Sequence, residues 1–223
     1  MSDNITDFMF DFETMGKTPT SVVLSLAFTP FKRNELLTFE EYVSDTYYWK
    51  FELSNQSSDY NRTIDKDTLE WWDKQDADVK RSQFNPTPDD IILTKMILEL
   101  HQVRKDHGIG NKSMGYCRGQ SFDFPILQNI IETVKGDISE IPLNSAFFPC
   151  AFWNQMDVRS YIRGLFCDVT QDKAPLPKGS LKGFRHHNPI DDCARAILHV
   201  KYAEKYAMGE LDIPDEIDPL SYK

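Results

Sequence analysis

Apolar and polar residues alternate along residues 5–16, close to the start of the chain. An alternation of this length is typical of a half-buried β-strand. The expected strand carries two carboxylates near its end, Asp11 and Glu13, and Gly16 follows as a turn residue. Side chains two positions apart in a strand share one face and lie roughly 6.6 Å apart, so the two carboxylates project together. This pair suits oxygen ligation of a divalent metal ion, and it equally suits two solvated charges at a strand end.

Apolar runs of strand length at residues 21–28 and 36–43 predict a second and a third strand. The connections between them are too short for crossover helices, so we expect an antiparallel meander of three strands. Residues 44–65 are polar and irregular and predict a loop with one short strand around residues 49–53. Short strands are also expected at residues 113–117 and 150–153.

Helical periodicity predicts the remaining elements. A short helix begins at Asp67 or Thr68, and longer ones cover residues 91–103, follow residues 118–125, and begin after Asp157 and Asn188. Asp157 and Asn188 are favourable N-cap residues, and the proline after Asn188 suits the first helical position. The last helix runs to about residue 208. Residues 209–223 are acidic and contain proline, which predicts a surface tail.

The short helix carries two adjacent tryptophans, Trp71 and Trp72. Neighbouring residues on a helix point about 100° apart, so the two indoles do not easily face the core together. They serve either as hydrophobic cover or as a platform on which single-stranded bases stack. The sequence leaves both interpretations open.

Composition limits the function classes. The 223 residues carry a formal net charge of −10, which argues against a protein that coats nucleic acid electrostatically. An enzyme whose bound cations supply positive charge at its site is not excluded. No apolar run approaches the roughly 18 residues of a membrane span, and the N-terminus lacks signal-peptide features, so we expect a cytoplasmic protein without membrane association. The four cysteines are scattered and predict reduced, mostly buried thiols.

Further acidic residues and a histidine stand at the ends of later elements. Asp123 lies at a strand-to-helix junction, where a carboxylate is favoured and can also act only as a cap. His187 and Asp192 open the last helix. Crowded carboxylates repel one another unless cations intervene, so the set predicts Mg²⁺ or Mn²⁺. Two such ions promote phosphoryl displacement, and a histidine with a pKa near 6.5 suits a general base.

At this point the chain resembles the DEDDh 3′→5′ exonucleases of the ribonuclease H-like superfamily, and among them the DexA type of T-even phages. The resemblance rests on an ordered set of motifs: DFETMG at 11–16, LEWWDKQ at 69–75, GYCRGQSFDFPIL at 115–127, FWNQMDVR at 152–159, PLPKGSLKGF at 175–184, and the segment from His187 through KYAEKYAMG. It implies an α/β fold with a mixed five-stranded sheet, strands 1–3 antiparallel, flanked by helices. Residues 1–223 would form one exonuclease domain, with 209–223 as its surface tail.

The resemblance also implies roles for individual residues. The four metal-site acids would be Asp11, Glu13, Asp123 and Asp192, holding two ions, and His187 would be the general base. The family spacing of a histidine, four residues and an aspartate fits His187 with Asp192. It fits His186 with Asp191 equally well. We choose His187 because the helix begins immediately after it, at Asn188 and Pro189.

Residues that meet the nucleic acid are expected around these acids. Thr14, Met15 and Gly16 would receive the terminal nucleotide, with the Met15 side chain against its base or sugar. The other substrate-binding candidates are Trp71, Trp72, Arg118, Asn154 and Lys182. Arg118 and Lys182, like Lys178 and Arg185, either contact phosphates or are solvated surface charges.

The function expected from the resemblance is hydrolysis of phosphodiester bonds from the 3′ end of single-stranded DNA. A two-metal mechanism with a histidine base would release nucleoside 5′-monophosphates. One alternative is a 3′→5′ exoribonuclease that trims RNA ends, because the sequence does not display a contact to the 2′-hydroxyl. Another is a non-catalytic protein that binds 3′ ends. The expected place of action is the cytoplasm, that of the host if the chain is phage-encoded.

Overall fold

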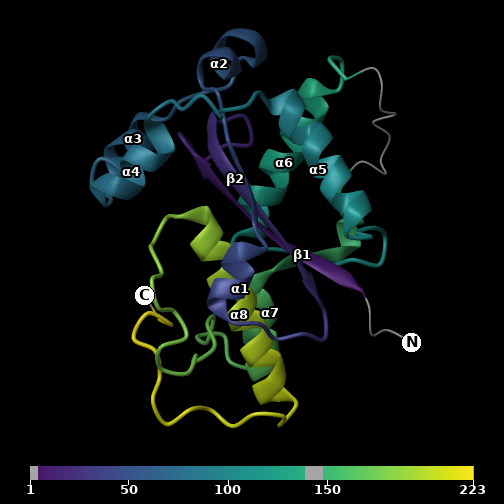
Figure 1. Ribbon diagram of the computed structural model, residues 1–223, viewed down its shortest axis with the longest axis vertical. Helices are drawn as coiled ribbons and strands as arrows, with labels where there is room; N and C mark the ends of the chain where they lie inside the picture. The colour runs from purple at the N-terminus through teal and green to yellow at the C-terminus, as the bar shows by residue number, and fades with distance from the viewer. Residues whose placement is uncertain (1–4, 139–147, 223) are drawn as a thin grey trace.

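A computed structural model describes residues 5–138 and 148–222 (Figure 1). The expected domain bounds, 1 and 223, lie outside the described residues. The strands and helices follow one another in the order β1 (Thr6–Thr14), β2 (Val23–Lys32), α1 (Phe39–Ser44), β3 (Tyr47–Lys50), α2 (Ser54–Tyr60), α3 (Lys66–Trp72), α4 (Ala77–Phe84), α5 (Leu93–Asp106), β4 (Gly115–Cys117), α6 (Gln120–Val134), η1 (Phe152–Asn154), β5 (Gln155–Asp157), α7 (Val158–Phe166) and α8 (Pro189–Ala207).

The five strands form one mixed sheet in the order β3-β2-β1-β4-β5. β1 pairs with β2 and β2 with β3 in antiparallel directions, whereas β1 pairs with β4 and β4 with β5 in parallel. The α/β fold with a mixed five-stranded sheet and three antiparallel strands is therefore confirmed. Because β1 and β4 are parallel, their carboxyl ends lie at the same edge of the sheet.

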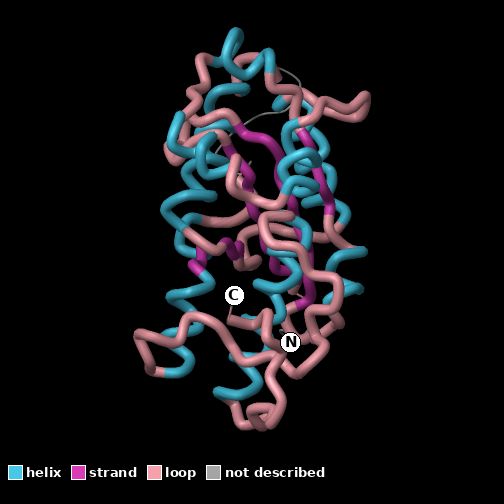
Figure 2. The backbone as a smooth tube through the Cα atoms, turned by 90° about the vertical axis from the view of Figure 1, so that its left-hand side faces the viewer, coloured by secondary structure: helices cyan, strands magenta, loops and turns pink. Residues whose placement is uncertain are grey.

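Helices cover both faces of the sheet (Figures 1 and 2). Phe8, Phe10 and Phe12 of β1 pack into a core with α5 and α6. Met9, between them, points to the opposite face and packs with residues of α1, α7 and α8. The two-residue period of a strand then places Asp11 and Glu13 on the face that α8 covers.

The prediction of a strand at residues 36–43 is wrong, because helix α1 begins there. Thr38 caps this helix by accepting a hydrogen bond from the backbone N–H of Glu41, and the Glu41 carboxylate accepts one from the backbone N–H of Thr38. This reciprocal capping box favours a helix over a strand. The third antiparallel strand is β3, at the place where the sequence predicted one short strand.

Other differences concern short elements. Residues 44–65 contain α2, and α4 begins after its N-cap at Asp76. The sequence predicts neither helix, because neither has a strong apolar stripe. Residues 152–154 form a 3₁₀ turn, and the strand expected at 150–153 comes directly after it as β5. The predicted caps of α7 and α8, at Asp157 and Asn188, are both confirmed.

The C-terminal segment is exposed over most of its length but is anchored at two points. Asp218 and Ser221 are buried. Asp218 Oδ2 accepts hydrogen bonds from the backbone N–H groups of Gly179 and Leu181, at 3.0 and 3.1 Å. The predicted surface tail therefore holds the loop that leads to α8.

Two expectations about the whole chain can be compared with the structure. All four cysteines are free, and Cys117, Cys150 and Cys193 are buried while Cys167 is exposed, as expected. Within residues 5–138 and 148–222, no helix is long and apolar enough to cross a membrane.

Candidate active site

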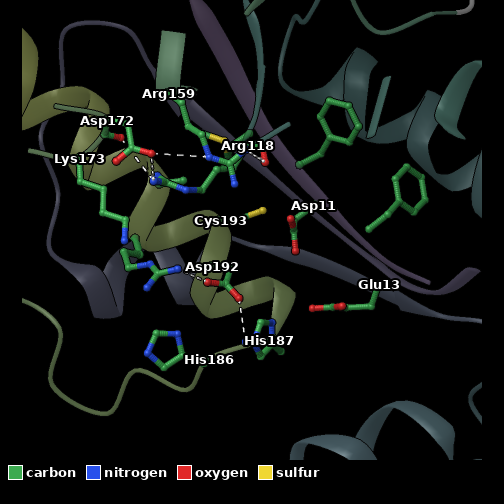
Figure 3. A pocket seen from close by; sticks show the side chains of 15 residues that line it. Asp11, Glu13, Arg118, Arg159, Asp172, Lys173, His186, His187, Asp192 and Cys193 are labelled. Atoms are coloured by element: carbon green, nitrogen blue, oxygen red, sulfur yellow. Dashed lines mark hydrogen bonds and ion pairs between the residues drawn. The ribbon is translucent and has the colours of Figure 1, made fainter. Parts of the chain in front are cut away.

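Acidic residues and histidines from separate elements meet in one pocket of about 470 Å³ at the carboxyl end of β1 (Figure 3). Asp11 and Glu13 come from the end of β1, where the pairing with β2 shifts register between Glu13 and Thr14. Asp192 comes from the first turn of α8, and His187 from the loop just before it. The fold thus brings together residues that lie far apart in the sequence.

Three of the expected site residues lie close enough to share one metal ion. Ligand atoms of Glu13, His187 and Asp192 all lie within 4.8 Å of one another, and this is the one group of its kind among the described residues. Asp192 Oδ2 accepts a hydrogen bond of 3.0 Å from the His187 backbone N–H, and its Oδ1 accepts one of 2.6 Å from Arg195 Nη2. His187 adopts a left-handed backbone with φ of 59°.

The neighbouring pair, His186 and Asp191, is arranged differently. The Asp191 carboxylate is buried and accepts hydrogen bonds from the backbone N–H and the Nε of Arg185, at 2.9 and 3.1 Å. It therefore caps the loop rather than joining the acids. His186 lines the same pocket as His187, but it is not among the three residues that could share an ion. The geometry thus places His187 together with Asp192.

Asp123 connects α6 to the central strand. Its Oδ1 accepts a hydrogen bond of 3.1 Å from the backbone N–H of Phe12, which lies between Asp11 and Glu13. The side chain is buried, and the N-cap of α6 is Gly119, so Asp123 is not the cap of its own helix. Its charge nevertheless reaches Asp11 and Glu13, whose pKa values it raises.

The acids disfavour ionisation in one another. Burial raises the pKa of Asp11 and of Glu13 well above their usual values, and repulsion from neighbouring carboxylates adds to the effect. Burial also raises the pKa of Asp123 to about 7 and that of Asp192 to about 6. Such a cluster is stabilised when cations neutralise it.

The surroundings of His187 favour its neutral form. Burial lowers its pKa, and the positive charge of Arg195 lowers it further. The ring of Trp71 meets the imidazole edge to face, with centroids 4.7 Å apart at 82°. A neutral imidazole is the form that accepts a proton.

The two tryptophans occupy different environments. Trp72 is 1% exposed, and its Nε1 donates a hydrogen bond of 2.9 Å to the carbonyl oxygen of Thr14. Trp71 is 40% exposed beside His187. The substrate-binding expectation for Trp72 is therefore wrong, because its indole belongs to the core. Trp71 retains an accessible face.

The segment after Glu13 is more enclosed than expected. Thr14 is buried, and its Oγ1 donates a hydrogen bond of 2.6 Å to the Gly16 carbonyl. The Met15 side chain packs into a core with Trp72, which leaves little of its surface for the expected contact with a base or sugar. At Gly16 a Cβ atom would lie 2.5 Å from Ser21 Oγ, which explains the glycine.

The remaining substrate-binding candidates are scattered. Arg118 lines the pocket, whereas Lys182 is exposed and does not. Asn154 lies at the opposite end of the parallel strands, where its Nδ2 donates to the carbonyl oxygens of Asn111 and Ser113. The expectation for Asn154 is wrong, because its amide fastens a loop at the amino end of β4. Lys178 pairs with Glu216.

The sequence reasoning missed several pocket residues. They are charged and line the pocket beyond Asp11: Arg159, Asp172, Lys173 and Arg195. Arg195 lies one helical turn after Asp192, a spacing that the sequence does show. The other three come from α7 and the following loop, and no local pattern links them to the acids.

Solved structures identify the fold. The nuclease domain of 3′hExo, a DEDDh family member bound to rAMP, superposes with a TM-score of 0.55 at 12% identity, covering 96% of this chain and 98% of that one. A zinc-bound complex of E. coli ExoI with single-stranded DNA gives 0.56 at 11% identity, covering 92% of this chain and 41% of that one. The chain thus spans less than half of ExoI and has the fold of the DEDDh exonucleases.

Sequence comparison identifies the family of the chain, which the fold alone does not. An exodeoxyribonuclease of Enterobacteria phage T4 is 40% identical over 223 residues, which cover 96% of this chain and 97% of the relative. The family described as 3′-5′ exoribonuclease Rv2179c-like domain matches residues 6–205, and the chain belongs to this family. It is a nuclease with 3′–5′ exonuclease activity on nucleic acid, and the resemblance found in the motifs is confirmed.

Proposed function

We propose that this nuclease removes nucleotides from the 3′ end of single-stranded DNA and releases nucleoside 5′-monophosphates. The observation that carries the proposal is the position of Glu13, His187 and Asp192 within 4.8 Å of one another, beside Asp11 and Asp123. Residues 1–223 would act as one exonuclease domain, which the T4 relative supports through its match over 96% of the chain. That relative also supports action in the cytoplasm of a host cell.

The acids fit a site for two divalent ions, Mg²⁺ or Mn²⁺. Burial and the neighbouring carboxylates raise the pKa values of Asp11 and Glu13, so bound cations would stabilise the ionised form of the site. Carboxylate oxygens are the ligands that Mg²⁺ and Mn²⁺ prefer. We assign Asp11, Glu13, Asp123 and Asp192 as the residues that would hold the ions. When bound, the ions would lower the pKa of the attacking water and stabilise charge on the phosphate.

His187 would act as the general base. Its imidazole is neutral because burial and Arg195 lower its pKa, and a neutral ring can take a proton from water. The hydrogen bond from its backbone N–H to Asp192 keeps the residue beside the acids. Trp71 confines the ring on one side, and its exposed face would stack on a base. Thr14 and Gly16 stay proposed contacts of the terminal nucleotide, because they follow Glu13 at the end of β1.

DNA is the first choice of substrate because the relative that is similar over almost the whole chain is named an exodeoxyribonuclease. The family description names an exoribonuclease, which supports RNA ends as the second candidate. A non-catalytic protein that binds 3′ ends is less well supported, since each of the four expected acids is present.

The test is product analysis on DNA and RNA strands of the same sequence, labelled at either end, with Mg²⁺ or Mn²⁺ added after EDTA treatment. We expect 5′-monophosphates released in order from the 3′ end, faster from DNA. Asp192→Asn should abolish this release, whereas Glu70→Gln, an exposed acid of α3, should not change it. Products from the 5′ end, or full activity of Asp192→Asn, would contradict the proposal, and faster release from RNA would favour the second candidate.

A further inference from the structure

The pocket that holds the acids continues into a basic end. Three cationic side chains line it on the far side of Asp11 from Glu13: Arg118, Arg159 and Lys173 (Figure 3). Arg118 follows β4, Arg159 lies on the first turn of α7, and Lys173 belongs to the loop after α7. Three separate parts of the chain therefore supply positive charge to one place, and the proposed chemistry at the acids does not use them.

The Asp172 carboxylate also lines this end of the pocket, and it pairs with the arginines only at long range. Asp172 Oδ2 lies 3.6 Å from Arg118 Nη2, 3.8 Å from Arg159 Nε and 3.9 Å from Arg163 Nη2. These separations exceed the usual length of a hydrogen bond. Asp172 therefore forms no close ion pair with any of these three guanidinium groups.

Arg118 has a hydrogen-bond donor that its protein neighbours do not use. Its side chain is 16% exposed, and its Nη1 atom is buried without a hydrogen-bond partner. Burial lowers its pKa to about 10, and repulsion from Arg159 acts in the same direction. A buried cation is costly unless an anion with suitably placed oxygens completes it. Guanidinium groups match the oxygens of a phosphate well.

The position of the basic end relative to the acids indicates which phosphate would bind. Arg118 is close enough to Asp11 and Asp192 to influence the pKa of both. Glu13 and His187 line the pocket on the other side of Asp11, and Trp71, beside His187, is where the terminal nucleotide is placed above. A strand with its terminal nucleotide there and its last phosphodiester at the acids would continue toward Arg118 and Arg159.

We propose that Arg118, Arg159 and Lys173 bind the phosphate one nucleotide upstream of the bond that is cut. The proposal rests on the exonuclease function proposed above. Binding of this upstream phosphate would make the enzyme selective for strands that carry a second phosphate beyond the one that is attacked. The Lys173 ammonium also donates a hydrogen bond to the Tyr222 carbonyl at 2.8 Å, which fixes it at this end of the pocket.

A pair of minimal substrates isolates the second phosphate. Both d(TpT) and d(pTpT) contain one cleavable phosphodiester, and only the second carries an upstream phosphate. We expect kcat/KM to be about tenfold higher for d(pTpT), since a hydrogen bond to a charged group contributes roughly that factor. Arg159→Gln and Lys173→Gln should each remove most of this preference. Lys205→Gln, which removes a charge near the end of α8, should keep it.

Arg159 lies on α7 and Lys173 in the loop after it. If one variant fails to fold, the other variant still tests the inference. If the wild-type protein cuts both dinucleotides equally, the inference is wrong while the exonuclease function stands. If the variants keep the wild-type preference and lose only thermal stability, the cations are structural and the inference is again wrong. If neither dinucleotide nor a longer strand is cut with Mg²⁺ or Mn²⁺, the proposed function fails and the inference falls with it.

Discussion

The buried indole of Trp72 donates a hydrogen bond of 2.9 Å to the carbonyl oxygen of Thr14, the last residue of the central strand β1. This contact joins α3 to the strand end that carries Glu13. It also sets the position of Trp71, whose ring meets Trp72 at a centroid distance of 5.1 Å and His187 at 4.7 Å. Trp72 is thus part of the core behind the site, and Trp71 contacts the site residue His187.

Trp72→Phe should destabilise the protein by about 1–3 kcal/mol, because the buried Thr14 carbonyl loses its partner. The ring volume also falls, which adds to the loss. Urea unfolding measures the change in the free energy of unfolding. Trp71→Phe is the matched control, and its effect should stay below about 1 kcal/mol because Trp71 is 40% exposed. Equal losses in both variants would contradict the different environments of the two indoles.

Trp71→Leu should instead weaken the binding of substrate. Stacking of a base on an aromatic ring is worth roughly 1–3 kcal/mol, so KM for a single strand should rise about tenfold or more. The melting temperature should change little. Steady-state kinetics on an oligonucleotide test this, and an unchanged KM would show that the exposed indole face does not meet the substrate.

Substitution of the two adjacent histidines tests which one is the base. His187→Gln should lower kcat by about 10²–10⁴-fold, the usual contribution of a general base. His186→Gln should have a much smaller effect, since His186 is not among the three residues that could share an ion. Circular dichroism of both variants controls for folding. A larger loss in His186→Gln would mean that His186 and Asp191 form the catalytic pair.

Asp11→Asn should stabilise the metal-free protein while it abolishes activity. Burial and the charges of Asp123 and Asp192 raise the pKa of Asp11 in the folded state. Above about pH 4 the unfolded chain releases the Asp11 proton more readily than the folded protein does. Asp11 therefore lowers the free energy of unfolding as the pH rises. The variant lacks this penalty.

We expect the melting temperature of Asp11→Asn in EDTA to exceed that of the wild type by about 3 °C at pH 7, or about 1 kcal/mol. The difference should shrink as the pH falls toward 4. Thermal melts across this range measure it, with Glu70→Gln as a control that removes an exposed charge. A difference that grows on acidification would contradict the repulsion among the acids.

The central parts of the fold and site could be predicted from local signals. The alternation before Asp11 identifies β1, and Asn188 with Pro189 identifies the start of α8. At residues 36–43 the apolar run predicts a strand, whereas the capping box of Thr38 and Glu41 stabilises a helix. Weak amphipathicity explains why α4 was missed.

Other features depend on packing that no single segment shows. Met15 is buried because Trp72 of α3 and Val79 of α4 close over it, so its neighbours come from three parts of the chain. The spacing of His187 and Asp192 is matched by the preceding pair, and only the direction of the carboxylates separates them. Arg159 reaches the pocket from the first turn of α7, and Lys173 reaches it from the loop after that helix.

The anchoring of the C-terminal segment gives residues far from the chemistry an influence over it. Asp218 holds the backbone at Gly179 and Leu181, and the carbonyl of Tyr222 accepts a hydrogen bond from Lys173. This loop continues to His187. A truncation at residue 215 would remove these contacts and leave the segment that carries His187 less firmly held. Activity would fall although no residue of the pocket had been altered, so an affinity tag on this protein belongs at the amino end.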